Sequence, residues 1–322
     1  MLPSSKLKFL LHCLVAVFSL SIGGANAQDY PKRDITLIVP FGPGGGADIL
    51  SRQFAEQLSK VLIGNVNVEN KPGGGSAIGI GQVVRSKPDG YTIGFAQAVS
   101  LVYLPMINQG LAYKTPDDYH VITKMSAQPH VLFVRPDSSW KTLDEFMIAV
   151  KKNPGKMRVA NAGVGQDLPI YELNKSSNSQ IVSVPFSGGS GEAIIALLGG
   201  RVEALLTGAA ATGHYQAGKI HAIAVLQKDR DKVFADAQPS VEAGYSAPVP
   251  NEQFLVAPKG IPKSVLDKLT DASLKVLRSE EFIKLAAANG FIVKADAPVA
   301  AKESLLRYTK TYSEVQAFIE KK

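Results

Sequence analysis

Residues 34–62 place an apolar run, a glycine-rich turn and an amphipathic stretch in immediate succession, reading DITLIVPFGPGGGADILSRQFAEQLSKVL. We expect a buried strand over Ile35–Val39 and a helix over Ala47–Leu62, joined by the turn Phe41–Asp48. This turn has almost no side chains with which to build an apolar wall. It presents backbone N–H groups at a helix N-terminus, where unpaired donors and the helix dipole stabilise an anion. The turn therefore predicts a carboxylate or phosphate site.

Residues 1–27 have the three regions of a secretory signal peptide. Two lysines and no acidic residue precede an apolar run over Phe9–Ile22, and Ala25-Asn26-Ala27 forms an A-x-A cleavage pattern. The run is shorter than the roughly 20 apolar residues that a membrane-spanning helix needs. We expect cleavage near Ala27 and a soluble protein in the periplasm.

The single cysteine, Cys13, lies inside this segment. A lipoprotein anchor is disfavoured, because Cys13 precedes most of the apolar run and follows His12 where a small residue is expected. After cleavage no cysteine remains for a disulfide, a thiolate metal site or a nucleophile.

The charge pattern argues against nucleic-acid binding. The formal net charge is +7, which falls to +5 without Lys6 and Lys8. The basic residues are dispersed, and the chain has only one tryptophan. The modest positive excess fits an anionic ligand or an ordinary solvated surface equally well.

Predicted strands and helices alternate along the chain. The strands are expected over Ile35–Val39, Val66–Glu69, Thr92–Phe95, Val131–Val134, Arg158–Ala160, Ile181–Val184, Ala204–Thr207 and Ala222–Leu226. The helices are expected over Ala47–Leu62, Ile78–Arg85, Thr142–Lys152, Leu168–Ser176, Glu192–Leu198, Pro262–Arg278, Ser279–Ala288 and Val299–Ile319.

This alternation predicts an α/β protein with mainly parallel sheets covered on both faces. The length suffices for two domains, and the chain contains no low-complexity linker. We therefore expect two lobes joined by chain crossings, with a cleft between them. The expected division is a first lobe over 28–125 and 231–322 and a second lobe over 126–230.

Four glycine-rich turns follow strands and precede helices, at Phe41–Asp48, Lys71–Gly79, Asn161–Asp167 and Pro185–Gly191. Ligands of open α/β sheets bind at this edge. The first turn also matches a dinucleotide fingerprint, Gly42-x-Gly44-x-x-Ala47, with Glu69 ending the next strand. Pro43 removes one N–H group from that turn, and nicotinamide cofactors are not expected to be plentiful outside the cytoplasm.

Catalytic motifs are poorly represented. No Gly-Lys-Ser/Thr follows the first turn, and the histidines have no metal-ligand spacing. A nucleophile elbow at Ser190 fails because Glu192 stands where glycine is required. Asp48 and Asp167 could pair as acid and base across a cleft, but Asp48 is explained more simply as a first-turn helix residue. We expect no enzyme activity, no cofactor and no metal.

A series of motifs resembles the Bug-type solute receptors, the extracytoplasmic binding proteins of tripartite tricarboxylate transporters. The resemblance spans essentially all of the mature chain. In chain order, the matching segments are Tyr30–Phe41 with Gly44–Asp48, Val68–Gly75, Pro88–Thr92, Asn153–Lys156, Gly163–Gly165, Val184–Gly188 and Leu198–Glu203.

The resemblance implies a two-lobed, periplasmic-binding-protein-like fold of type II that closes on one small carboxylate in the cleft between its lobes. In this family one carboxylate is held by backbone N–H groups and ordered waters from the first two glycine turns. Carried over by position, the ligand-binding residues are Phe41, Gly42, Gly44, Gly45, Gly46, Ala47, Asp48, Ser76, Ala77, Ile78, Ala96, Gln97, Gly163, Val164, Gly165, Gln166, Asp167, Pro185, Phe186, Ser187, Gly188, Thr207 and Gly208.

Three departures from the family pattern bear on specificity. The third turn continues with Gln166-Asp167 where a small hydroxyl residue is usual, the fourth has Phe186-Ser187-Gly188 in place of Tyr-Lys-Gly, and Ala77 replaces a frequent polar residue. The site thus loses a cation and gains Asp167. We expect a ligand with fewer negative charges than citrate, unless Asp167 caps its helix.

The sequence therefore predicts a monomeric periplasmic receptor that captures a mono- or dicarboxylate, or an amino-acid-like acid, for the membrane subunits of a tripartite tricarboxylate-type transporter. Two alternatives stay open. One is an exported α/β enzyme such as a nicotinamide-dependent dehydrogenase. The other is a ligand sensor that acts on a signalling partner such as a sensor kinase.

Overall fold

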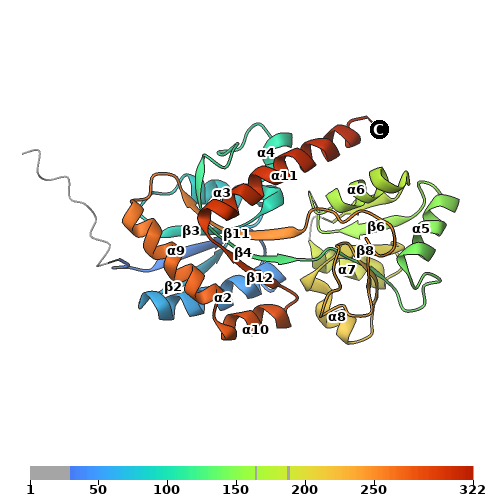
Figure 1. Ribbon diagram of the computed structural model, residues 1–322, viewed down its shortest axis with the longest axis horizontal. Coiled ribbons are helices and arrows are strands. Elements are labelled where there is room, and N and C mark those ends of the chain that lie inside the picture. The colour runs from blue at the N-terminus through green and yellow to red at the C-terminus, as the bar shows by residue number, and fades with distance from the viewer. Residues whose placement is uncertain (1–29, 164, 187–188, 322) are drawn as a thin grey trace, which may run out of the picture.

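A computed structural model describes residues 30–163, 165–186 and 189–321. Two lobes lie side by side, each built on one six-stranded sheet (Figure 1). The first sheet has the order β12-β4-β11-β3-β1-β2. Its strands are β1 (Ile35–Val39), β2 (Val66–Asn70), β3 (Thr92–Gln97), β4 (Tyr119–Gln128), β11 (Asn251–Pro258) and β12 (Ile292–Asp296).

The second sheet has the order β10-β9-β5-β8-β6-β7. Its strands are β5 (Val131–Val134), β6 (Arg158–Asn161), β7 (Val182–Pro185), β8 (Ala204–Thr207), β9 (His221–Val225) and β10 (Gln238–Pro239). The α/β fold class predicted from the sequence is confirmed. Both sheets are mixed, however, because β11 runs antiparallel to β3 and β4, and β5 runs antiparallel to β8 and β9. The expectation of mainly parallel sheets was wrong.

Helices cover both faces of each sheet. The helices are α2 (Gly46–Leu62), α3 (Ala77–Val84), α4 (Leu104–Ile107), α5 (Leu143–Lys152), α6 (Leu168–Ser177), α7 (Ser190–Leu198), α8 (Thr212–Gln216), α9 (Lys263–Leu277), α10 (Glu280–Ala288) and α11 (Pro298–Ile319). Short helical turns are η2 (Gly74–Ser76), η3 (Val99–Tyr103) and η4 (Ala209–Ala211). In the described residues, no helix is both long and apolar enough to cross a membrane.

Successive side chains of a strand point to opposite faces of its sheet, and here both sets are apolar, so both faces must be buried under helices. Leu37 and Val39 of β1 pack with residues of α2, α9 and α10, whereas Ile38 packs on the opposite face with residues of α3 and α11. The second sheet repeats this arrangement, because Leu132 of β5 joins α5 and α6 and Phe133 joins α7. Strands that are apolar at consecutive positions are typical of a sheet buried on both sides.

Two segments join the lobes. Strand β4 ends at Gln128, and Pro129 and His130 lead directly into β5 of the other sheet. The chain returns between β10 and β11, where Asn251 pairs with Gln128. We propose that the lobes follow the sheets, so that the crossings lie at 129–130 and 240–250. The boundaries expected at 125/126 and 230/231 fall inside β4 and before β10, respectively, because neither β4 nor β11 was expected from the sequence.

A buried charge cluster fastens α11 to these crossing strands. Lys124 of β4 is 7% exposed, and its Nζ lies 3.2 Å from Glu252 Oε1, 2.7 Å from Asp296 Oδ2 and 3.1 Å from Ser304 Oγ. These partners come from β11, β12 and α11. Removing water from a charge is costly unless it is paired, so the buried carboxylate of Glu252 depends on the ammonium group of Lys124.

We predict an asymmetric loss of stability within this cluster. Lys124→Met lowers the free energy of unfolding by about 3–5 kcal/mol, because Glu252 stays buried without its cation. Glu252→Gln lowers it by only about 1 kcal/mol, because Lys124 keeps Asp296. Urea denaturation measures both, with Lys263→Met as the control, since Lys263 pairs with Asp267 on an exposed helix surface. A Lys124→Met protein as stable as this control contradicts the prediction.

Candidate functional site

The first glycine turn leads directly into α2, which begins at Gly46 without a side-chain cap. The first helical hydrogen bond runs from the N–H of Ile49 to the carbonyl of Gly45, at 3.0 Å. The N–H groups of Gly46 and Ala47 therefore precede the helical ladder and carry the positive end of the helix dipole. An acceptor from outside the chain can bind them.

Asp48 stabilises the shape of this turn from the side that faces away from the cavity. Its Oδ2 accepts hydrogen bonds from Gly44 N–H at 2.9 Å and Arg52 Nε at 3.0 Å, and its Oδ1 accepts one from Asn70 Nδ2 at 2.8 Å. Asn70 also donates to the carbonyl of Phe41. Burial alone would raise the pKa of Asp48, but the hydrogen bonds from Arg52, Gly44 and Asn70 outweigh it and hold the pKa below its ordinary value.

The second lobe presents a similar helix start. Helix α7 begins at Ser190, its cap residue Gly189 has φ +78°, and no side chain caps it. The first helical bond runs from Ala193 N–H to the Gly189 carbonyl at 3.2 Å, so the amides of Ser190 and Gly191 precede the ladder. The Ser190 hydroxyl accepts a 3.3 Å hydrogen bond from Thr207 at the end of β8.

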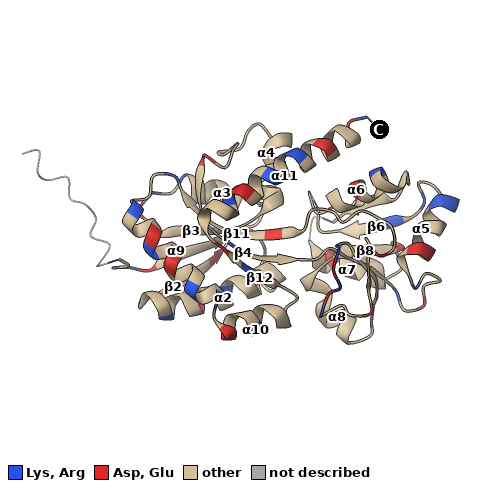
Figure 2. Cartoon of the chain, viewed as in Figure 1, with Lys and Arg blue, Asp and Glu red and all other residues tan. Residues whose placement is uncertain are grey.

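Both helix starts line one cavity of about 760 Å³ between the lobes. Its polar side chains carry amide, hydroxyl and imidazole groups, namely Gln97, Gln128, His130, Gln166, Ser190, Thr207, Thr212, His214, Gln216, Asn251 and Asn289. No Lys, Arg, Asp or Glu occurs among the described residues that line it. Figure 2 shows charges of both signs spread over the outer helices of both lobes. Any anion in the cleft would therefore meet backbone N–H groups and amide, hydroxyl and imidazole side chains, and no Lys or Arg of the described lining.

The structure brings together about half of the residues predicted for the site. Lining the cavity are Phe41, Gly42, Gly44, Gly45, Gly46, Ala47, Gln97, Gln166, Thr207 and Gly208. Val164, Ser187 and Gly188 lie outside the described residues. The remaining predicted residues do not line the cavity, namely Asp48, Ser76, Ala77, Ile78, Ala96, Gly163, Gly165, Asp167, Pro185 and Phe186.

Local geometry explains these differences. Ala96 and Gln97 alternate on β3, so Ala96 enters the core while Gln97 reaches the cleft. The N–H of Gly163 is bound by the Asn161 side chain. The Ile78 side chain lies over Gly73 and is more than half exposed, away from the cavity. Phe186 packs against the core of the second lobe, under Arg201.

Asp167 also turns away from the cleft. It precedes the first residue of α6, and its Oδ1 accepts a 3.1 Å hydrogen bond from Gly165 N–H. Burial raises its pKa, against hydrogen bonds from backbone N–H groups and from Tyr171 that lower it. The expectation of a ligand less charged than citrate required Asp167 in the cleft, so the structure removes its basis. Asp48 and Asp167 likewise form no acid–base pair there.

The dinucleotide interpretation also lacks its acidic residue. Glu69 forms an ion pair with Lys71 and does not line the cavity. In dinucleotide-binding proteins, the acidic residue at the position of Glu69 must point into the nucleotide site to bind the ribose. In the part of the chain that the structure describes, no three His, Cys, Asp or Glu side chains cluster as a metal site.

Hydrogen bonds across the cleft hold the lobes together. Gln166 Nε2, from the turn before α6, donates to Gln97 Oε1 at the end of β3, at 3.0 Å. The N–H of Ala209 donates to Gln128 Oε1 at 3.2 Å. Gln128, His130 and Asn251 were not predicted as site residues. They stand on the crossing segments, whose strands β4 and β11 were not expected from the sequence.

Two titratable groups, the buried His130 and the half-buried Glu172, flank the segment by which the chain returns to the first lobe. Burial lowers the pKa of His130 to about 4, although a hydrogen bond with the Val249 backbone opposes this. Burial raises the pKa of Glu172 on α6 to about 7, against a hydrogen bond with the Val249 backbone and the charge of Lys175. Glu172 Oε1 is buried without a hydrogen-bond partner among the described residues. Tyr312 of α11 faces this carboxylate from the first lobe.

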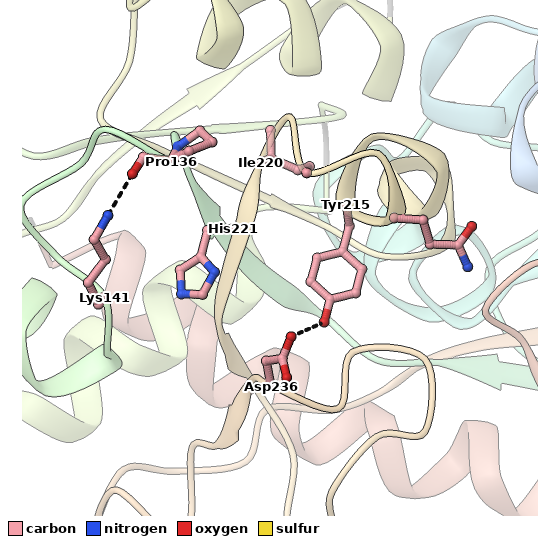
Figure 3. A pocket seen from close by; sticks show the side chains of 8 residues that line it. Pro136, Lys141, Tyr215, Ile220, His221 and Asp236 are labelled. Atoms are coloured by element: carbon pink, nitrogen blue, oxygen red, sulfur yellow. Dashed lines mark hydrogen bonds between the residues drawn. The ribbon is translucent and has the colours of Figure 1, made fainter.

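A second cavity, of about 570 Å³, lies on the second lobe alone (Figure 3). Its charged groups already have partners, because Lys141 Nζ donates to the Pro136 carbonyl at 2.6 Å and Tyr215 donates to Asp236 at 2.9 Å. Movement of the lobes cannot enclose a site whose walls come from one lobe. The interlobe cleft is therefore the candidate site.

The chain is similar in sequence and in structure to one group of known proteins. Residues 50–310 match the family described as tripartite tricarboxylate transporter family receptor. A UPF0065 protein of Bordetella pertussis is 32% identical over 275 residues, 84% of each chain. BugT of the same organism is 31% identical over 294 residues, 87% of this chain and 88% of its own. MatC of Rhodopseudomonas palustris, solved with bound malate, superposes with a TM-score of 0.80 at 26% identity, covering 89% of this chain and 99% of MatC.

The raised pKa of Glu172 predicts that the free energy of unfolding depends on pH. Its pKa is raised in the folded protein, so the carboxyl group favours folding at low pH, and this contribution is lost as the pH rises from about 4.5 through about 7. Glu172→Gln, which cannot ionise, should be more stable than the unmodified protein at pH 8, by up to about 3 kcal/mol, and equal to it at pH 4. Denaturation at a series of pH values measures this difference. Glu303→Gln, at an exposed site on α11, is the control, and a pH-independent effect of Glu172→Gln contradicts the prediction.

Proposed function

The chain belongs to the tripartite tricarboxylate transporter receptor family, and on that premise we propose that it captures a small carboxylate between its lobes and presents it to the membrane subunits of a transporter. Proteins of this family are solute-binding receptors of the periplasm, and the structure with bound malate belongs to one of its relatives. For this chain, a periplasmic location after cleavage near Ala27 is part of the proposal.

One observation carries the proposal. Two helix N-termini from opposite lobes, at Gly46–Ala47 and Ser190–Gly191, line a cavity whose described lining contains no Lys, Arg, Asp or Glu. Such amides replace the water around a carboxylate, and charge-assisted hydrogen bonds are stronger than neutral ones. Asp48, the acidic residue nearest the first helix start, is neutralised by Arg52 behind the turn.

The remaining polar groups favour closure around the ligand. Gln97 and Gln166 come from different lobes and meet at 3.0 Å, so both reach the same point from opposite sides. An amide side chain can donate or accept, and can therefore bridge to a carboxylate or to its water shell. Hinge movement at the crossing segments would open the cleft for entry and close it over the ligand.

The same cleft would serve a sensor that acts on a signalling partner. Capture of membrane proteins on the ligand-loaded receptor separates the two roles: recovery of transporter subunits supports uptake, and recovery of a sensor kinase alone contradicts it.

We predict that a small carboxylate raises the melting temperature of the protein. At a concentration 100 times Kd, binding stabilises the native state by about 2.7 kcal/mol, which raises the melting temperature of a chain of this length by roughly 4–5 °C. Differential scanning fluorimetry against mono- and dicarboxylates, acidic amino acids and NAD(P) measures the shift. A shift with NAD(P) alone would favour the enzyme interpretation and contradict the receptor.

A variant with a large side chain in the cleft tests whether the carboxylate binds there. A Cβ atom added at Gly191 meets no atom of the described residues within 4 Å, so Gly191→Trp adds a large side chain at a position that lines the cavity. We expect this variant to fold and to lose the carboxylate-induced shift. Gly110→Trp, at an exposed glycine outside the cavity, should retain it. Loss of the shift in both variants, or in neither, argues against binding in the cleft.

A further inference from the structure

The two lobes also meet on the side of the crossing segments that faces away from the cleft. There a small void is lined by η3 and α11 of the first lobe and by α6 of the second. His130, Gln166 and Asn251 line both the void and the cleft, so they stand between the two. Figure 1 shows α6 and α11 on one side of β4 and β11, and α7, α8 and α10 on the other. We call the packing of α6 on η3 and α11 the back contact.

The back contact is closely packed. Leu168 of α6 is buried in a hydrophobic cluster of the first lobe, together with Val99 and Tyr103 of η3. Gly165, at φ +79°, permits this approach, because a Cβ atom there would collide with the Val99 side chain and lie 3.5 Å from Tyr103 Cδ1. Since η3 and α6 belong to different lobes, hinge movement at the crossing segments must separate or compress this packing.

Glu172 of α6 places a carboxyl group in the back contact. Its Oε1 is buried without a hydrogen-bond partner in the described residues. The void beside it has a volume of about 10 Å³, which is at the lower limit for a single water molecule. A buried carboxylate without donors is costly, whereas the neutral carboxyl group loses much less on burial. The back contact as described therefore fits the protonated form of Glu172.

The groups that face Glu172 do not themselves change charge near neutral pH. Burial lowers the pKa of His130, on the outgoing crossing, to about 4, and burial raises the pKa of Tyr312 on α11. Both are therefore neutral between pH 5.5 and pH 8.5. Lys175, one turn along α6, favours the ionised form of Glu172, but its Nζ also lies 3.4 Å from Glu314 Oε2 of α11. Burial outweighs this cation and raises the pKa of Glu172 to about 7.

We propose that Glu172 is a proton-controlled latch of the back contact: the protonated carboxyl group lets α6 pack on η3 and α11, and its ionisation releases α6 from them. Because the crossing segments lie between the back contact and the cleft, release on one side lets the lobes rotate so that the cleft narrows on the other. A cleft of about 760 Å³ is large enough for a drug-sized ligand, so it has room to narrow. The latch acts on the lobes themselves, whatever solute the cleft binds.

Double electron–electron resonance between spin labels measures both sides of the crossing segments without a ligand. The only cysteine of the chain is Cys13, so in a Cys13→Ser background two introduced cysteines are the only labelling sites. One pair, Gln180→Cys with Lys310→Cys, reports the distance from the second lobe to α11. The other pair, Ala217→Cys with Ala287→Cys, reports the distance across the cleft. All four positions are exposed.

We expect the ratio of released to latched protein to rise about thirtyfold between pH 5.5 and pH 8.5, if the pKa of Glu172 falls from about 7 to its ordinary 4.5 on release. Release should lengthen the back distance and shorten the cleft distance, each by at least about 2 Å. Glu172→Gln, which cannot ionise, should keep the latched distances at both pH values. Glu314→Gln, which removes only an exposed ion pair, should keep the pH response.

Three results would overturn the latch or its coupling to the cleft. A back distance that is the same at both pH values, or one that changes equally in Glu172→Gln, would show that Glu172 does not control the contact. Loss of the pH response in Glu314→Gln would assign the control to the ion pair. A pH-dependent back distance with a constant cleft distance would overturn the coupling. Since no carboxylate is added, these results are independent of the melting-temperature test of the proposed function.

Discussion

The pairing of β4 with β11 is the constraint on which the rest of the structure depends. These two antiparallel strands belong to the first sheet, yet their ends lead into the second lobe, and Gln128 and Asn251 face each other where they leave it. Both residues consequently line the cleft. The buried Lys124, paired with Glu252 and Asp296, ties the same strands to the elements that cover them. The position of the cleft therefore follows from backbone pairing and from one buried cation, and not from a linker.

In the proposed receptor, an anion binds in a cleft whose described lining contains no Lys, Arg, Asp or Glu. Asp48 and Arg52 satisfy each other behind the first glycine turn, so the turn is held in place while its front presents only backbone N–H groups. Helix α7 adds a second set of amides from the other lobe. A cationic side chain would fix one carboxylate strongly in one position, whereas neutral donors and water allow related acids to occupy the same site. On the proposed function, this arrangement lets one scaffold accept several related carboxylates.

Local pattern predicted the regular elements well, and it failed where the fold depends on tertiary contacts. All eight expected strands and all eight expected helices occur, with small shifts at their ends. Strand β4, reading YHVITKMSAQ, was missed because it buries a lysine and a serine that look exposed in the sequence, and β11 begins with the polar Asn251, Glu252 and Gln253. Their partners lie more than 100 residues away, so no local signal reveals the pairing. The first glycine turn was correctly placed at a cavity, but Asp167 turned inward to its own loop.

A crystal structure with a bound carboxylate tests the central claim most directly. We predict carboxylate oxygens at about 2.7–3.1 Å from backbone nitrogens at Gly46–Ala47, with Ser190–Gly191 closing on the ligand directly or through one water. We also predict no lysine or arginine nitrogen in contact with the ligand. A carboxylate held by a basic side chain, or bound outside the interlobe cleft, would contradict the claim.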